Sequence, residues 1–573
     1  MAAAAGPYPA PQQLPTPERL SGIGNVRFPI TANPEAQEWF TQGVNLFFDF
    51  WDYESDRAFE QSIRSDPACA MCYWGLYESE SFGLDGGAYA KEALDQAVAL
   101  EKHATRREKL YIEAARAQET AGGDGPAPAE DLSILRTLVK KNPRDAPAAI
   151  LLAEALEDGY DNGRPRSGQT EALALLSAVL QREPDNSAAN HLWIHAVEAG
   201  SRPQDALPSA EILASLAPGS GHMVHMPGHI FYRLGEYDRA QAAFDASFRV
   251  DETYMLTQHV SVDDDWNYVH NLMYSAANLL EAGRLREAAQ VSAQLTGARG
   301  LSANSLYPWS ARDSVARIDP QLPVALRTAD WPRAAEMTAE KVAASKTVSG
   351  PSTPYPHLQL LAARLSDFAR GMQAVEARRY VDAEQCSTQL DAGLWRISEE
   401  LRGEPAEGSK TAAPARAGAM SADPQSKPML KMLSIMSLEL RGAIQAGQGQ
   451  EPEARTLFAA AQLQEQQLGY HEPPLYIRPA SETAGASWLA AGNWSAAESA
   501  YREALLERPN SGFPLYGIAL AEEGSGQIAA AAVAYRNFLS AWRSADPDLP
   551  QLQHAREFLA AHPGGAARVM MRP

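Results

Sequence analysis

The sequence has few cysteines, a shortage of basic residues and no long apolar run. Three cysteines among 573 residues argue against a disulfide-built scaffold and are compatible with a reducing compartment. Lysine and arginine total 50 against 71 acidic residues, a net charge of -21, which opposes binding to nucleic acid or to an anionic membrane surface. The chain contains neither 18 consecutive apolar residues nor a basic and apolar leader, so we expect a cytoplasmic protein.

Several catalytic motifs are also missing. The sequence has no Gly-rich phosphate loop, no H-E-x-x-H, no G-x-S-x-G and no alternation of aromatic and basic residues. These absences argue against the common nucleotide-dependent and serine-hydrolase mechanisms and against a nucleic-acid surface. The possibility of an enzyme whose active site uses other residues stays open.

A period of 34 residues is present instead. This step leads from Gly492 to Gly526 and from Tyr501 to Tyr535. The segments GEYDRAQAAFDAS and GNWSAAESAYREALLERP fit a pattern that resembles the tetratricopeptide repeat (TPR). Over most of residues 36–545, the resemblance implies an all-α fold, a TPR-type α-solenoid of stacked antiparallel helix pairs.

Longer stretches resemble a largely uncharacterised group of bacterial TPR proteins. They include DPACAMCYWGL, NHLWIHAVEAG and GHMVHMPGHIF. Relatives often carry a histidine where this chain has Phe48. No settled activity comes with the group, so the resemblance implies a fold and leaves the function to the residues.

Breaks in the period and shifts in composition predict how the chain is organised. The stretch 403–428 is rich in small and polar residues, which is typical of a flexible linker or exposed loop. The longer segment TYMLTQHVSVDDDWNY is either a lid or filler. We predict an N-terminal arm over 1–25, an N-terminal TPR array over 26–402, the linker over 403–428, a C-terminal array over 429–545, and a final helix and tail over 546–573.

Histidines gather in one part of the chain. Seven of the twelve lie between His191 and His270, and His191 with His195 forms an H-x-x-x-H pair. The 34-residue step leads from this pair to a second one, His225 and His229. Residues i and i+4 share a helix face, and equivalent positions of stacked repeats align. The two pairs should therefore face each other across an accessible concave groove, which predicts a metal site.

The predicted ligand set combines imidazoles with carboxylates. Such a set suits Cu, Fe, Zn or Mn, held as one tetrahedral ion or as two ions bridged by Glu154 or Glu198. Richness in imidazole and the lack of H-E-x-x-H favour redox or oxygen chemistry over hydrolysis. The candidate ligands are His191, His195, His222, His225, His229, Glu154, Glu198 and His270.

Two other interpretations compete with a metal centre. The histidines could pack at helix interfaces, or a metal-free groove could bind a small molecule, a peptide or a protein partner. Cys69 and Cys72 form a C-x-x-C without a second half-site, so we predict that they simply pack in the core. Weaker candidates for substrate or partner contacts are Glu78, Glu157, Tyr476 and Glu482.

Overall fold

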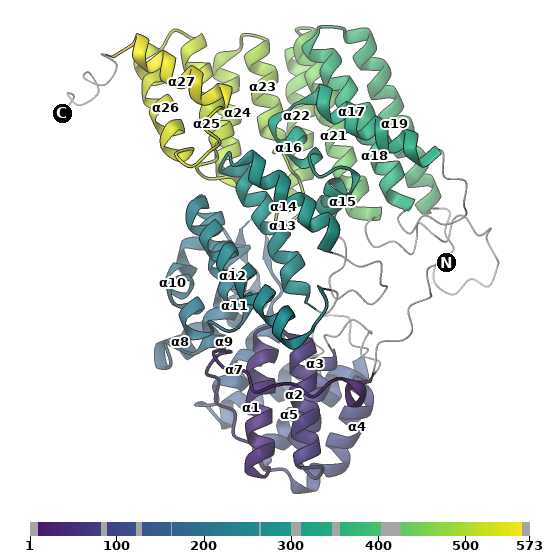
Figure 1. Ribbon diagram of the computed structural model, residues 1–573, viewed down its shortest axis with the longest axis vertical. Coiled ribbons are helices and arrows are strands. Elements are labelled where there is room, and N and C mark those ends of the chain that lie inside the picture. The colour runs from purple at the N-terminus through teal and green to yellow at the C-terminus, as the bar shows by residue number, and fades with distance from the viewer. Residues whose placement is uncertain are drawn as a thin grey trace. The chain divides into compact units, whose positions relative to one another are not determined.

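The described part of the chain is almost entirely helical. The structure is a computed structural model that describes residues 10–81, 89–121, 129–161, 163–262, 265–298, 311–346, 356–402 and 426–563. Successive helices pack as antiparallel pairs (Figure 1). The only strands among these residues are β1 (Tyr160–Asp161) and β2 (Arg164–Pro165), paired antiparallel. The predicted all-α solenoid of stacked helix pairs is confirmed. Most of the predicted linker, 403–425, lies outside the described residues.

Two compact units divide the chain. The first consists of residues 1–234, 239–271 and 299–307, and the second of residues 235–238, 272–298 and 308–573. The first unit contains η1 (Pro11–Gln13), α1 (Pro34–Phe48), α2 (Asp52–Ser65), α3 (Ala70–Ser81), α4 (Ala90–Leu100), η2 (Glu101–His103), α5 (Arg106–Ala121), α6 (Ala129–Lys141), α7 (Ala146–Leu156), α8 (Ser167–Arg182), α9 (Ser187–Glu198), η3 (Pro203–Ala206), α10 (Leu207–Leu216), α11 (Gly221–Arg233), most of α12 (Tyr237–Gln258) and the start of α13 (Trp266–Glu281).

The second unit continues the pattern of paired helices. One of its boundaries with the first unit falls within α13, between Asn271 and Leu272. It contains the end of α13, α14 (Leu285–Ala298), α15 (Ala311–Ile318), α16 (Leu322–Thr328), α17 (Trp331–Lys346), α18 (Pro356–Glu376), α19 (Tyr380–Arg402), α21 (Ser426–Gly447), α22 (Glu451–Gln466), α23 (Ala480–Ala490), α24 (Trp494–Glu507), α25 (Gly512–Gly524), α26 (Ile528–Ala541) and α27 (Pro550–Ala561).

Glycines on the first helix of a pair accept an aromatic ring from the second. Phe59 of α2 lies against both Gly43 of α1 and Gly75 of α3, and a Cβ at either glycine would overlap its ring. Phe244 of α12 lies in the same way against Gly228 of α11. Because a close-packed interior leaves no spare volume at these points, the missing side chain lets the paired helices approach closely.

Side-chain caps and two long-range hydrogen bonds stabilise the starts of the histidine-bearing helices. The side chain of Asn186 accepts a hydrogen bond from the Ala189 amide at the start of α9, and Ser220 caps α11 in the same manner. Such caps stabilise helix starts by about 1 kcal/mol. Asn25 and Ser187 exchange two hydrogen bonds of 3.1 and 3.0 Å. Part of the predicted loose arm is therefore tied to α9.

The cysteines are buried, as predicted, but two of them are bonded to each other. Cys69 and Cys72 form a disulfide, and Cys386 is free and buried. The prediction that the C-x-x-C pair simply packs in the core was therefore incomplete. The spacing of three residues at the start of α3 allows the two sulfur atoms to bond. None of the described helices combines the length and the apolar character needed to cross a bilayer.

Candidate metal centre

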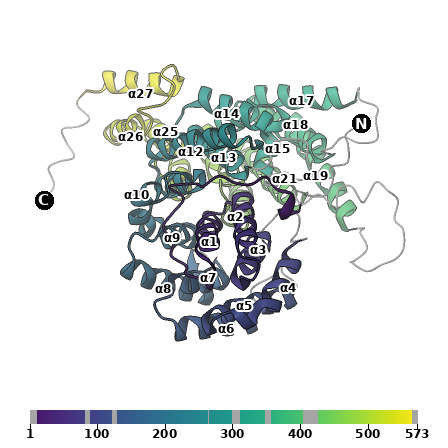
Figure 2. The same ribbon diagram turned by 60° about the horizontal axis from the view of Figure 1, so that its bottom comes forward.

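Six histidines from three helices of the first unit meet in one place. Helix α9 lies beside α1 (Figure 2) and packs against α11. The two H-x-x-x-H pairs lie together, with the ring centroids of His195 and His229 6.2 Å apart. Two trios form, and within each trio the ligand atoms lie within 4.8 Å of one another: His191, His195 and His222, and His225, His229 and His270.

These side chains are buried rather than displayed in an open groove. His195 is the most accessible, with 17% of its side chain exposed, whereas the other five rings are at most 4% exposed. The prediction of solvent-accessible histidines is therefore wrong for four of the five on α9 and α11. Helix α13 contributes His270 and two asparagines to the same cluster, which the repeat pattern of α9 and α11 alone does not reveal.

Two rings are oriented by carbonyl oxygens. Nδ1–H of His191 donates to the Phe48 carbonyl oxygen at 2.6 Å. Nδ1 of His225 lies 2.7 Å from Oδ1 of Asn271, and the amide group of Asn271 donates to the Phe244 carbonyl oxygen at 2.9 Å. Because the amide nitrogen is used there, Oδ1 must be the acceptor and His225 must carry its proton on Nδ1. Both histidines therefore have an unprotonated Nε2.

His222 is held in the same tautomer. Its Nδ1 lies 3.1 Å from Oδ1 of Asn267. The amide group of Asn267 donates to Ser247 at 3.3 Å and to Asp251 at 2.8 Å, so Oδ1 is again the acceptor. The Nε2 atom of His222 is buried and has no hydrogen-bond partner among the described residues. A lone pair of this ring therefore points into the cluster unused.

Glu198 links the two histidine pairs. One carboxylate oxygen accepts from Nδ1–H of His195 at 2.9 Å, and the other accepts from Nδ1–H of His229 at 2.8 Å. Burial raises the pKa of Glu198, but the interactions with His229 and His195 outweigh burial and hold this pKa well below its ordinary value. The structure thus places Glu198 behind the imidazoles, as an orienting group of the kind that commonly supports metal-binding histidines.

The unprotonated nitrogens face one another. Nε2 of His225 lies 2.7 Å from Nε2 of His229, and Nε2 of His195 lies 3.1 Å from Nε2 of His191. In neutral rings with the proton on Nδ1, neither nitrogen of such a contact has a hydrogen to share. Burial is the largest cause that lowers the pKa, and so favours the neutral ring, in His191, His222, His225, His229 and His270. The cluster therefore presents a set of metal-ligand lone pairs.

Aromatic side chains cover one side of the first trio. The ring of Phe50 lies 4.7 Å from that of His191, 5.3 Å from that of His195 and 5.7 Å from that of His222, measured between centroids. The indole N–H of Trp266 donates to the Phe50 carbonyl oxygen at 2.7 Å. These aromatic rings therefore cover one side of the trio. Sequence reasoning missed Phe50, and its neighbour Phe48 contributes only a backbone oxygen.

The remaining candidates lie elsewhere. Glu154, at the end of α7, lines a pocket together with Glu78 and Glu157 and belongs to neither histidine trio. In the second unit, Tyr476 is 3% and Glu482 1% exposed. Tyr476 donates to Glu439, and Glu482 pairs with the buried Arg327 at 2.7 Å. Both residues make internal contacts of the second unit.

The chain has remote similarity to several solved structures. No family model and no curated protein matches the chain. The human IFIT1 dimer with m7Gppp-AAAA has a TM-score of 0.33 at 12% identity, over 87% of this chain and 95% of that one. Yeast Tom70 has a TM-score of 0.27 at 12% identity, over 92% and 96%. The Cut9–Hcn1 hetero-tetramer has a TM-score of 0.26 at 13% identity, over 82% and 98%. The fold assignment therefore rests on the helix pairs described above.

Proposed function

We propose that the first unit binds two transition-metal ions, one in each histidine trio, through Nε2 atoms. The observation that carries this proposal is the fixed tautomer of the rings. Nδ1–H is engaged in His191, His195, His222, His225 and His229, which leaves five unprotonated Nε2 atoms in one buried cluster. Metal-binding histidines characteristically donate their other ring N–H to a carbonyl or carboxylate in this way.

The ligand type narrows the choice of metal. Each trio consists of imidazoles alone, and imidazole suits Cu, Zn, Fe or Ni, whereas Mn prefers oxygen ligands. Among the four metals that the sequence suggested, Mn is therefore the least favoured. Glu198 uses both oxygens on the Nδ1 side of His195 and His229, so it supports the ligands and does not need to bridge two ions.

The arrangement of the centre favours catalysis over a purely structural role. Three imidazoles for each ion leave coordination positions open, and a bound metal there would supply either redox chemistry with oxygen or an activated water. Phe50 and Trp266 cover one side, whereas His195, 17% exposed, provides the approach. We favour redox chemistry because the ligand set is imidazole-rich, and we keep hydrolysis as the alternative.

Metal analysis tests the proposal. The full chain, purified without a histidine tag and reconstituted separately with Cu, Zn, Fe and Ni, should retain about two equivalents of at least one metal, one for each trio. The variant His191→Gln/His222→Gln should keep about one equivalent. His103→Gln, which changes an exposed histidine, is the matched control. Protein that retains no metal under any of these conditions would overturn the proposal and favour a metal-free scaffold.

A further inference from the structure

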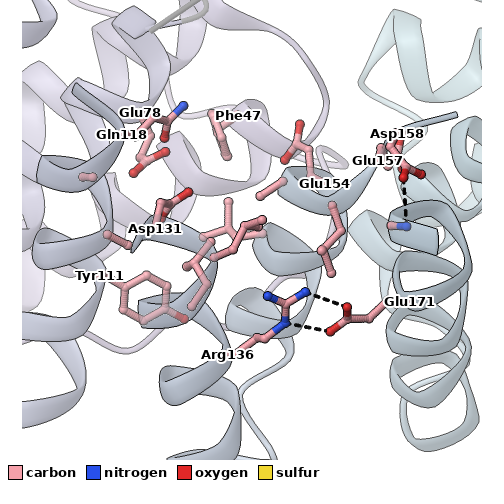
Figure 3. A pocket seen from close by; sticks show the side chains of 18 of the residues that line it. Phe47, Glu78, Tyr111, Gln118, Asp131, Arg136, Glu154, Glu157, Asp158 and Glu171 are labelled. Carbon is pink, nitrogen blue, oxygen red and sulfur yellow. Dashed lines mark hydrogen bonds and ion pairs between the residues drawn. The ribbon is translucent and has the colours of Figure 1, made fainter. Parts of the chain in front are cut away.

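A second feature of the first unit is a pocket of about 540 Å³. Helices α1, α3, α5, α6, α7 and α8 contribute side chains to it (Figure 3). Part of its wall is apolar or aromatic and includes Phe47, Trp74, Leu132, Leu135 and Leu151. A cavity with such a wall suits a small organic molecule with an aliphatic body.

The charged groups in the pocket are almost all acidic. Six carboxylates line it against one guanidinium, that of Arg136. Arg136 is already engaged with Glu171 through two hydrogen bonds of 2.9 and 2.7 Å. Asp158 accepts from the backbone amides of Gly168 and Gln169 at 3.0 and 2.6 Å. The other four carboxylates form no ion pair within the described part of the chain: Glu78, Asp131, Glu154 and Glu157.

These four carboxylates form two groups. In Figure 3, Glu78 and Asp131 lie together on one side of the pocket, and Glu154 and Glu157 lie on the other. No three of them bring oxygen atoms within 4.8 Å of one another, by a search of the described residues. A compact metal ion needs several oxygens around one point. The spread of charge therefore suits an extended organic cation better than a metal ion.

One buried polar group in the wall points to the same class of ligand. The phenolic oxygen of Tyr111 is buried and completes no hydrogen bond among the described residues, and the ring of Trp74 lies 5.2 Å from that of Tyr111, measured between centroids. An ammonium group can donate to a phenolic oxygen and is attracted to aromatic faces. Burial and the charges of Asp131 and Glu154 raise the pKa of Glu78 to about 8, and the nearby Trp74 indole opposes part of this rise. A bound cation would favour the ionised form of this carboxylate.

We propose that this pocket binds an aliphatic diamine or polyamine, with one ammonium beside Glu78 and Asp131 and another beside Glu154 and Glu157. Helix α7, which carries Glu154 of the pocket, also packs against α9, which carries His191 and His195. The proposal of an amine site depends only on the residues of the pocket. Presentation of the amine to the metal rests on the function proposed above.

Calorimetric titration of the full chain tests the site. The probes are 1,4-diaminobutane and spermidine, with 1,4-butanediol as the uncharged analogue and Ca²⁺ as the inorganic cation. Replacing two carboxylates by their isosteric amides, in Glu78→Gln/Glu157→Gln, should weaken diamine binding by about tenfold or more, because charge-assisted hydrogen bonds are lost at both ends. Glu92→Gln, which changes an exposed carboxylate of α4 outside the pocket, should leave the affinity within about twofold.

The outcomes separate the two proposals. Diamine binding that the double variant loses and the Glu92→Gln control keeps supports the amine site. Three results would each overturn it: no binding of either amine, equal binding of the diol, or tighter binding of Ca²⁺ that depends on the same carboxylates. Metal content measured on the same preparations reports on the histidine centre alone, because neither Glu78 nor Glu157 belongs to a histidine trio.

Discussion

His225 and His229 point their Nε2 atoms at each other across 2.7 Å, while Asn271 and Glu198 hold the ring protons on the opposite nitrogens. Two lone pairs at this distance repel, and burial disfavours the extra proton that would relieve the repulsion. A metal ion that accepted both lone pairs would remove the conflict. Asn271 and Glu198 therefore support the proposed metal site, because they leave the two Nε2 atoms facing each other.

Glu198→Gln tests this role directly. The substituted amide keeps the shape of the side chain but has one oxygen and one NH₂ group in place of two acceptors. It can then accept from only one of His195 and His229, so the other ring is driven to place its proton on Nε2. We expect metal affinity to fall by about 10- to 100-fold, measured by competition with a chelator. Helical circular dichroism should be unchanged.

Glu211→Gln is the matched control for this change. Glu211 lies on α10 and pairs at the surface with Arg239, so its replacement should leave metal affinity unaltered. If Glu198→Gln also left the affinity unaltered, the assignment of ring protons to Nδ1 would be wrong.

The preference for redox chemistry predicts an optical response. Imidazole-rich sites bind copper or iron, and both change oxidation state at such ligands, whereas zinc does not. Protein loaded with Cu(I) or Fe(II) without oxygen should change its visible absorption when oxygen is admitted. The variant His225→Gln/His229→Gln should lose at least half of this change. A chain that stays colourless and retains only Zn would leave hydrolysis or a structural role.

Close packing of α11 against α12 should be essential for the centre. A Cβ at Gly228 would overlap the ring of Phe244, which lies 4.9 Å from the ring of His225. We expect Gly228→Ala to lower the free energy of unfolding by about 1–3 kcal/mol, measured by urea denaturation, and to weaken metal binding. Gly297→Ala in α14, where a Cβ meets nothing within 4 Å, should instead be neutral or slightly stabilising. Equal effects at the two glycines would contradict this account.

The sequence predicted the two histidine pairs but not the groups that orient their rings. The 34-residue period predicted that His191 and His195 lie next to His225 and His229, because equivalent positions of stacked repeats align in space. It could not show that His191 meets the carbonyl oxygen of Phe48, 143 residues away, since a backbone acceptor leaves no trace in residue type. Contacts of this kind depend on how helices far apart in the chain are placed.

Two further features of this region did not follow from the sequence, for the same physical reason. The inserted segment before α13 breaks the repeat frame, so the pattern did not reveal that Asn267 and Asn271 orient His222 and His225. Glu154 occupies the repeat position of His195, yet it lies one repeat away and lines the neighbouring pocket. Equivalent positions of adjacent repeats lie along one face, but periodicity does not say where one site ends and the next begins.

Diamine binding should strengthen as pH rises from 6 to 8. Burial, with the charges of Asp131 and Glu154, raises the pKa of Glu78 to about 8, and burial raises that of Asp131 to about 6. An empty pocket therefore holds protons near neutral pH, and binding a cation must displace them. The affinity for 1,4-diaminobutane should level off above about pH 8 and fall again as the amine itself loses its proton near pH 10. Affinity that is constant or falls between pH 6 and 8 would contradict this titration.

Finally, the acidic pocket should lower the stability of the ligand-free chain at alkaline pH. A buried carboxyl whose pKa is raised from 4.5 to about 8 in the folded protein, as for Glu78, binds its proton more tightly there than in the unfolded chain. Stability therefore falls as pH rises from 4.5 towards 8, and the full penalty is present above pH 8. Glu78→Gln removes this penalty, so we expect its melting temperature at pH 8.5 to exceed that of the wild type by roughly 2 °C or more, with little difference at pH 5.

Saturating 1,4-diaminobutane should raise the melting temperature of the wild type but not that of Glu78→Gln/Glu157→Gln, because the ligand stabilises only a pocket that binds it. A variant that is less stable than the wild type at pH 8.5 would show that Glu78 supports the fold rather than a ligand.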